Sequence, residues 1–283
     1  MAYRVIRSRY STTSKLHLLI ISKSNKSQSN PQACVVPRPI GWISTRNKQT
    51  GVDNLAPYVH SLKLPKPPGT DLLSNYPKKK RYSQFNNLTF DPPYVMFSAN
   101  QDAAAQRKNT VTNAEASGQF CWNVATWELR EAVNATAEWF ADEVDEFERA
   151  GLEKLAGSVV QVPMVKRSPI RFECEYYSTL RLPGNAPMGS VDVVVGRVVG
   201  IHIEERVLTE GKVDLGKVMP IARCGYFEYA VIRGDAVFEM VIPGDPKLLV
   251  GLEGNVKKAK EMNGARDEEE AKAVVAQEKD GGD

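Results

Sequence analysis

The sequence predicts a mainly β protein with flanking helices, an α+β arrangement, and three of its stretches carry that prediction. Residues 170–180 alternate strictly between apolar and polar side chains, which is the two-residue period of a strand. Residues 191–203 form a second β-rich block, interrupted at Gly196 and Gly200, where barrel strands bend or bulge. Residues 33–58 indicate a strand, a polar turn and a second strand. Helix-like runs are fewer and lie between the expected strands.

The first expected strand pair occupies residues 33–58. Its first half is rich in residues that favour strands, namely Val35, Val36, Ile40, Trp42 and Ile43. Residues 47–51 carry the turn, and residues 52–56 resume an extended run. Pro37 and Pro39 exclude a helix and favour an edge or bulged strand.

A strand and a helix are expected next. Residues 94–98 form a short continuous apolar run, which predicts a strand buried on both faces. Asn109 or Thr110 is expected to cap a helix that continues through Ser117, with Gly118 as its stop.

Another strand and helix follow them. Residues 119–125 predict the strand, and Thr126 is expected to cap the helix. Side chains that suit a buried face recur along this helix at spacings of four, three and four residues, at Leu129, Val133, Thr136 and Phe140. An acidic run follows this helix in the sequence and predicts a solvated face. It comprises Asp142, Glu143, Asp145, Glu146 and Glu148.

The alternation over residues 170–180 sorts the side chains onto two faces. One face carries Ile170, Phe172, Cys174, Tyr176 and Leu180, and the other carries Arg171, Glu173, Glu175 and Thr179. His202 stands between two isoleucines in the next β block, where a lone histidine is more often structural than catalytic. The β-rich part ends with residues 223–229.

Composition and motifs argue against several function classes. The formal net charge of +3 is too small to indicate nucleic acid binding. The cysteines are far apart and include no C-x-x-C pair, which argues against a zinc site and a disulfide framework and fits a reducing compartment. The longest apolar run, residues 18–21, is too short to span a bilayer. No Ser-His-Asp set, paired-carboxylate motif, Walker loop or G-x-G-x-x-G motif is visible.

The two ends of the chain differ from its centre. Residues 1–32 are rich in Arg and Ser and lack acidic residues, which is the composition of a mitochondrial transit peptide. We favour the alternative of a disordered tail or a leader outside the mature protein. Residues 245–283 are rich in Glu and Lys and predict a polar helical tail. The expected domain therefore spans residues 33–244.

Residues 58–81 interrupt the pattern of this domain. Their prolines and a basic run at their end make the stretch loop-like and aperiodic, and long loops are unusual in compact domains. The codons of Pro57-Tyr58-Val59, Ser74-Asn75 and Arg81 can spell a splice donor, a branch point and an acceptor in one frame. We therefore interpret the stretch as a translated, unspliced intron of 24 codons, 81 − 58 + 1. The alternative is a genuine insertion, such as a lid or a basic docking loop.

Several motifs occur in a telling order along the chain: VVPRPIGWIST, NLAPY, SQFNNLTFDPPYVMFSAN, RKNTVTNAEASGQFCWNVA and SPIRFECEY. Together they resemble the flavin reductase-like family. When residues 58–81 are left out, Pro57 joins Tyr82 to give NLAPYSQFNNLTFDPP, which is the continuation that the family pattern implies. The resemblance implies an FMN-binding split β-barrel of Greek-key type over residues 33–244.

The resemblance also implies the residues that bind FMN. Contacts to the flavin ring and ribityl chain would come from Ser44, Thr45, Asn54, Ala56, Tyr82 and Ser83. The phosphate would be held by Ser98, Arg107, Lys108 and Thr110 at the start of a helix, which suits an anion. Asn109 replaces an Asp that is frequent in the family, and its amide can still cap the helix. Without the resemblance, the same residues fit two strands and a capped surface helix equally well.

The function implied by the resemblance is that of an FMN-dependent oxidoreductase, which uses NAD(P)H to reduce FMN or a flavin-linked acceptor. No catalytic side chain is implied, because the flavin itself performs the hydride chemistry. The alternative is a non-catalytic flavin-binding or redox-sensing protein. The resemblance further implies a homodimer and leaves a partner monooxygenase open, while the cysteine usage favours the cytoplasm. No metal, nucleic acid or membrane partner is expected.

Overall fold

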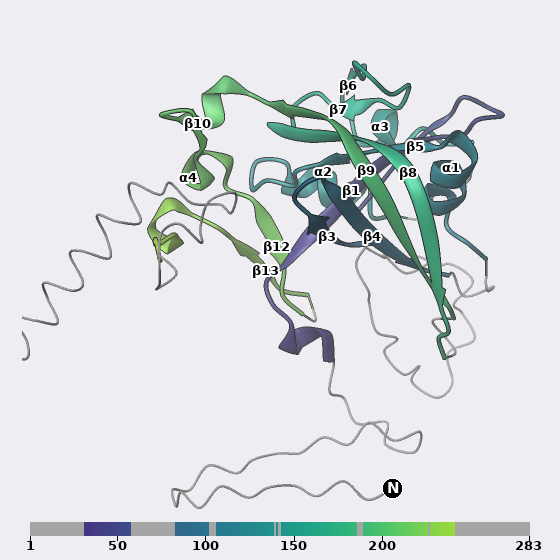
Figure 1. Ribbon diagram of the computed structural model, residues 1–283, viewed down its shortest axis with the longest axis horizontal. Coiled ribbons are helices and arrows are strands. Elements are labelled where there is room, and N and C mark those ends of the chain that lie inside the picture. The colour runs from purple at the N-terminus through teal and green to yellow at the C-terminus, as the bar shows by residue number, and fades with distance from the viewer. Residues whose placement is uncertain are drawn as a thin grey trace, which may run out of the picture.

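The computed structural model describes residues 31–57, 83–101, 106–138, 140, 143–185, 189–225 and 227–240. Within them, a nine-stranded antiparallel sheet curls into a barrel (Figure 1). Its strands are β1 Arg38–Arg46, β2 Asp53–Pro57, β3 Ser83–Thr89, β4 Tyr94–Asn100, β5 Gln119–Asn123, β8 Ile170–Leu182, β9 Val191–Ile203, β12 Ile221–Arg223 and β13 Tyr229–Val231. Strands β1, β3, β4, β9, β8 and β5 each pair with the next, and β5 pairs back with β1, which closes the ring.

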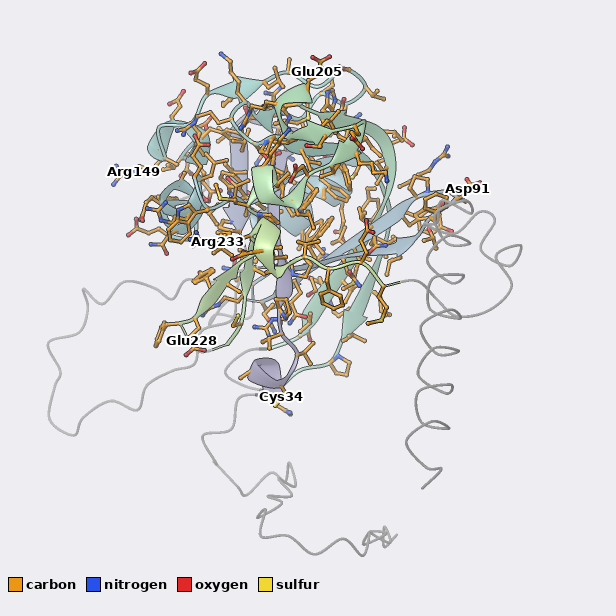
Figure 2. The ribbon with its side chains drawn as sticks, turned by 90° about the vertical axis from the view of Figure 1, so that its left-hand side faces the viewer. Cys34, Asp91, Arg149, Glu205, Glu228 and Arg233 are labelled. Atoms are coloured by element: carbon orange, nitrogen blue, oxygen red, sulfur yellow. The ribbon has the colours of Figure 1, made fainter. Side chains whose placement is uncertain are left out.

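Short elements complete the described part of the chain. Two small hairpins pair β6 Lys154–Leu155 with β7 Met164–Val165 and β10 Leu208–Thr209 with β11 Lys212–Val213. The helices are α1 Asn109–Ser117, α2 Arg130–Ala135, α3 Glu146–Arg149 and α4 Leu215–Val218, with 3-10 turns at Pro31–Cys34, Glu205–Val207 and Gly234–Ala236. Figure 2 places Arg149, at the end of α3, and Asp91, in the turn between β3 and β4, on opposite sides of the molecule.

The barrel interior holds the largest buried side chains. Trp42, Phe97, Phe120 and Phe147 are all fully buried, and they meet in one apolar cluster. The indole nitrogen of Trp42 donates to the Thr136 hydroxyl at 3.0 Å, so the one polar atom of this ring has its partner. Gly196 has no room for a side chain, because an added Cβ would lie 2.3 Å from the Phe120 ring. This close approach explains one of the two glycines that interrupt β9.

Strand β1 is the central strand, and the expected edge strand is therefore wrong. Residues 42–44 pair with β2 on one side and β5 on the other. Val35 and Val36 are also not part of the strand, which begins at Arg38 after an exposed 3-10 turn. The prolines are accommodated because Pro37 precedes the strand through a cis bond and Pro39 lies near its start.

Other elements agree with the sequence in kind and differ in detail. Strand β4 buries alternate residues, so it is buried on one face rather than two. Helix α1 ends at Gly118 as predicted, but its N-cap is Lys108, which makes no side-chain capping bond. Helix α2 is shorter than expected, and the Thr126 hydroxyl accepts from the Leu129 amide one turn before it. Two register shifts interrupt the alternation of β8.

Strands β2 and β3 lie along the same edge of β1. Strand β12 pairs with β1, and Pro220, just before β12, bridges to Thr126, just after β5, so β5 and β12 share one edge and β2 and β3 share the other. Pro57 stands opposite Trp42, and Ser83 stands opposite Gly41. The two residues that flank 58–82 therefore occupy consecutive positions of one ladder. The expected insertion, residues 58–81, itself lies outside the described residues, as do residues 1–30 and 241–283.

Candidate functional site

Three of the expected site residues meet where β1, β2 and α1 converge. Thr45 and Asn54 face each other across the β1–β2 ladder, and Thr110 belongs to the first turn of α1. The Asn54 side-chain oxygen accepts from the Thr110 hydroxyl at 2.6 Å and from the Thr45 hydroxyl at 3.4 Å. Asn113, one turn further along α1, donates to Thr45 at 3.4 Å. These four polar residues tie the helix start to the strand pair.

Glu146 completes this cluster, although the sequence places it on a solvated face. The residue is only 7% exposed. Its Oε2 accepts from the Asn54 side-chain amide at 2.7 Å and from the Leu55 backbone amide at 2.6 Å. The expectation fails because Asp145 caps α3 with its side chain, which turns Glu146 and Phe147 inward against β2. An acidic run broken by Val144 and Phe147 is a weak signal of such a turn.

The Glu146 carboxyl has a raised pKa, which favours its protonated form near neutral pH. Burial raises its pKa most, the Leu55 amide opposes that shift, and the charges of Asp145 and Lys108 raise and lower it respectively, leaving a pKa of about 8. A protonated carboxyl still has one carbonyl oxygen, and Oε2 fills that role for both of its donors. The hydrogen bonds from Asn54 and Leu55 are therefore kept in the protonated form as well.

Arg107 and Lys108, both expected at the phosphate, have different surroundings. The Arg107 guanidinium binds both oxygens of Glu115 at 2.6 and 2.7 Å and Asp192 at 3.0 Å. Asp192 is 1% exposed and also accepts from Arg181 at 2.8 Å. These contacts lower the pKa of Glu115 and of Asp192 and raise that of Arg107. Arg107 therefore anchors the start of α1 to β9, whereas the charge of Lys108 acts on Glu146, whose pKa it lowers.

The remaining expected residues are dispersed around this cluster. Ser44 is fully buried and donates to the Pro163 carbonyl at 2.7 Å, away from Thr45. Ala56 packs on the core opposite Ile43. Half-buried Ser98 lies on β4, next to the residue that faces Asp192. Asn109 is the first residue of α1. Ser83 pairs with Gly41 through its backbone, and Tyr82 lies outside the described residues.

A second buried carboxylate, Glu173, is separate from this cluster. It lies on β8 with no exposed surface and accepts from the backbone amides of Ser158, Val159 and Val160 at 2.8 to 3.0 Å. Its Oε1, which also accepts from Ser158, pairs with His202 Nε2 at 2.6 Å, and this contact favours a structural role for His202. Burial would raise the pKa of Glu173, but the Val160 amide, His202 and the other two amides together lower it to about 2.

The chemistry of the first cluster suits a phosphorylated, polyhydroxylated ligand. A helix start, a lysine, two hydroxyls and an oriented amide supply the positive field and hydrogen-bonding groups that a phosphate and a ribityl chain need. FMN therefore fits the residues present. Among the described residues, no group of His, Cys, Asp or Glu is arranged to hold a metal ion. None of the described helices is long and apolar enough to cross a membrane.

Comparison with known proteins identifies the family of the chain. The flavin reductase like domain matches residues 74–219, so the match begins within the interval 58–82. An uncharacterized protein of Aquifex aeolicus is 31% identical over 202 residues, which cover 71% of this chain and 87% of that protein.

Solved structures agree on the fold. Nitrilotriacetate monooxygenase component B from Bacillus cereus is 27% identical, superposes with a TM-score of 0.64, and the match covers 80% of this chain and 100% of that one. A Shewanella frigidimarina protein with a split barrel domain is 20% identical, with a TM-score of 0.53, and the match covers 73% of this chain and 86% of that one. The closed ring with its additional strands is thus a split barrel, as the sequence implied.

Proposed function

Because this chain belongs to the flavin reductase-like domain family, we propose that it is an FMN-dependent oxidoreductase that uses NAD(P)H to reduce FMN. The observation that carries the proposal is the junction of Thr45, Asn54 and Thr110 at the start of α1, with Lys108 as the N-cap. When bound, FMN supplies the hydride chemistry. The role of the protein is then to bind and orient it.

Each residue of the junction has a separate task in this proposal. Lys108 and the start of α1 hold the phosphate by charge and by backbone N–H groups. Thr45 and Asn54 direct a hydroxyl and an amide group toward the ribityl chain and ring, and Thr110 belongs to the phosphate site in the first turn of α1. Arg107 holds α1 in place through Glu115 and Asp192 rather than binding the phosphate directly. That assignment departs from the sequence-based expectation, which placed both cations on the phosphate.

Purified protein is expected to bind FMN and to oxidise NADH or NADPH when FMN is added. Flavin fluorescence quenching measures the binding, and the absorbance of the nicotinamide measures the turnover. Saturable binding without oxidation of either nicotinamide would indicate the alternative, a non-catalytic flavin-binding protein. Absence of saturable binding would reject both.

Replacing Lys108 with alanine is expected to weaken FMN more than riboflavin. A lost charge-assisted phosphate contact costs about 1.5–3 kcal/mol, roughly a ten- to hundredfold loss of affinity, whereas riboflavin has no phosphate to lose. Lys212→Ala, on the exposed β11 strand, removes the same charge elsewhere and is the matched control. Equal weakening of both ligands by Lys108→Ala would exclude it as a phosphate residue.

We also propose where the electrons go and how the protein assembles. The related Bacillus cereus protein is named as component B of a monooxygenase, which supports transfer of reduced flavin to a partner monooxygenase.

We propose a homodimer in the cytoplasm, and the free state of all four cysteines is compatible with a reducing compartment. Light scattering of the purified protein should give twice the 31.4 kDa chain mass.

A further inference from the structure

We propose that Glu146 is a positioning residue whose neutral carboxyl orients Asn54 for FMN and whose ionisation opposes phosphate binding. The inference rests on the proposed FMN site and adds to it a residue and a pH dependence. It begins from the shape of the hydrogen-bond chain. Glu146 accepts from the Asn54 amide nitrogen, and the Asn54 oxygen accepts from Thr110.

The hydrogen bonds that Asn54 makes with Glu146 and Thr110 fix the orientation of its side chain. An asparagine amide can present either its oxygen or its nitrogen to a neighbour, and the two orientations differ little in shape. Here the Asn54 nitrogen donates to the Glu146 carboxyl and the Asn54 oxygen accepts from the Thr110 hydroxyl, so the nitrogen faces Glu146 and the oxygen faces α1. Without Glu146, the amide could rotate and disturb both contacts. Glu146 therefore acts on the ligand through Asn54.

The same carboxyl fixes the backbone beneath the site. Its bond to the Leu55 amide joins α3 to β2, between Asn54 and Ala56. Leu55 is fully buried, so this part of β2 cannot move without disturbing the core. A residue 91 positions away thus holds the strand that presents Asn54.

The charges that face Glu146 determine the sign of the pH effect. Asp145 precedes it in α3, and Lys108 faces it from the start of α1. Lys154 on β6 bridges Asp145 and Asp53, which also pairs with Arg46, so these four charges largely neutralise one another. An ionised Glu146 would add a negative charge that competes with the phosphate for Lys108. Loss of its proton, with a pKa of about 8, should therefore weaken phosphate binding.

The experiment compares Glu146→Gln, Glu146→Ala and the control Glu148→Gln, which lies exposed on the same helix. Glutamine keeps one carbonyl oxygen for both donors and cannot ionise, whereas alanine removes the acceptor. Dissociation constants for FMN and riboflavin are measured from about pH 7 to about pH 9, where the phosphate stays dianionic because its second pKa is about 6. Thermal melts of each protein without flavin accompany them.

In the wild type and in Glu148→Gln, FMN affinity should fall about fivefold as the pH rises through this range, and riboflavin affinity should change less. Glu146→Gln should bind FMN within about twofold of wild type at pH 7 and show no such fall. Glu146→Ala should lose about tenfold for both flavins. If folded Glu146→Ala binds both flavins as wild type does, or if Glu146→Gln keeps the pH dependence, the inference is wrong. If no protein binds flavin while all melt cooperatively, the proposed function itself fails.

Discussion

Glu173→Ala is expected to lower the free energy of unfolding by about 3 kcal/mol or more, because a buried backbone amide left without its acceptor costs about 1–3 kcal/mol. Three successive amides, those of Ser158, Val159 and Val160, lose the carboxylate that accepts from them, and His202 loses its partner. The Val160 amide is buried and those of Ser158 and Val159 are half-buried, so water replaces the lost acceptor only in part. For a domain of this size the melting temperature should fall by roughly 10 °C.

Glu175→Ala is the matched control, because Glu175 lies two residues along β8 and is exposed. Chemical denaturation of both variants gives the difference in unfolding free energy. A loss in Glu173→Ala no larger than in Glu175→Ala would show that the three amides find other partners. Flavin affinity per folded molecule should be unchanged in both, since Glu173 lies outside the junction of β1, β2 and α1.

The pH dependence of stability should carry opposite contributions from the two buried carboxyls. The folded-state pKa of Glu173 is lowered from 4.5 to about 2, so its contribution is complete above pH 4.5 and is lost as the pH falls toward 2. The folded-state pKa of Glu146 is raised from 4.5 to about 8, so the fold holds a proton that the unfolded chain has released. Stability therefore falls as the pH rises from 4.5 to 8. Glu146→Gln should remove that second slope and leave the acid-side slope, as measured by melts across pH.

The strands could be predicted from the sequence because their signal is local. A two-residue period identifies β8 and β9, and Gly118 marks the end of α1 within a few residues of its start. The closure of β5 onto β1 joins Trp42 to Asn123, and nothing within either segment indicates that partner. This explains why β1 was expected at an edge although it is central.

The candidate site was predictable only in part, for the same reason. The family resemblance supplied Thr45, Asn54 and Thr110, which the fold brings together. It did not supply Glu146, because its acidic neighbours gave the run the composition of a solvated face and its donors lie 91 and 92 residues away. The commitment of Arg107 to Glu115 and Asp192 was missed likewise, since the second partner lies 85 residues away. The local pattern of charged residues shows which charges are near one another in the sequence, whereas their hydrogen-bond partners are determined by the fold.

Deleting residues 58–81 is expected to stabilise the barrel and to tighten FMN binding at least tenfold, about 1.4 kcal/mol. The ladder explains why the deletion should be tolerated. Pro57 and Ser83 face the consecutive residues Trp42 and Gly41, so β2 and β3 follow β1 as one strand. The deletion leaves Tyr82 as one extra residue between them, which is the length of a β-bulge. Deleting 58–82 would leave none.

The size of the effect follows from loop closure and from the place of the interruption. Joining two adjacent ladder positions through about 25 residues costs on the order of 3 kcal/mol of chain entropy, which sets an upper limit for the gain in stability. The resemblance assigns flavin contacts to Tyr82 and Ser83, directly after the interval, so fixing them to the end of β2 should favour the bound geometry. A chain carrying 24 Gly and Ser residues in place of 58–81 is the control for length. If the length of the interruption alone causes the effect, this control should match the full chain in unfolding free energy and in FMN affinity.

Tyr82 gives the deletion a sharper test and separates an unspliced intron from a functional insertion. Removal of 58–81 should bind FMN more tightly than removal of 58–82, because only the first keeps the aromatic residue that the resemblance places on the flavin. Transcripts of the gene should include a form that lacks the 24 codons 58–81, 81 − 58 + 1. If every transcript retains them and the full chain binds FMN as tightly as the shortened one, the segment belongs to the working protein. The strand pairs of β1 with β2 and β3 would then tolerate an insertion between them without any loss of FMN affinity.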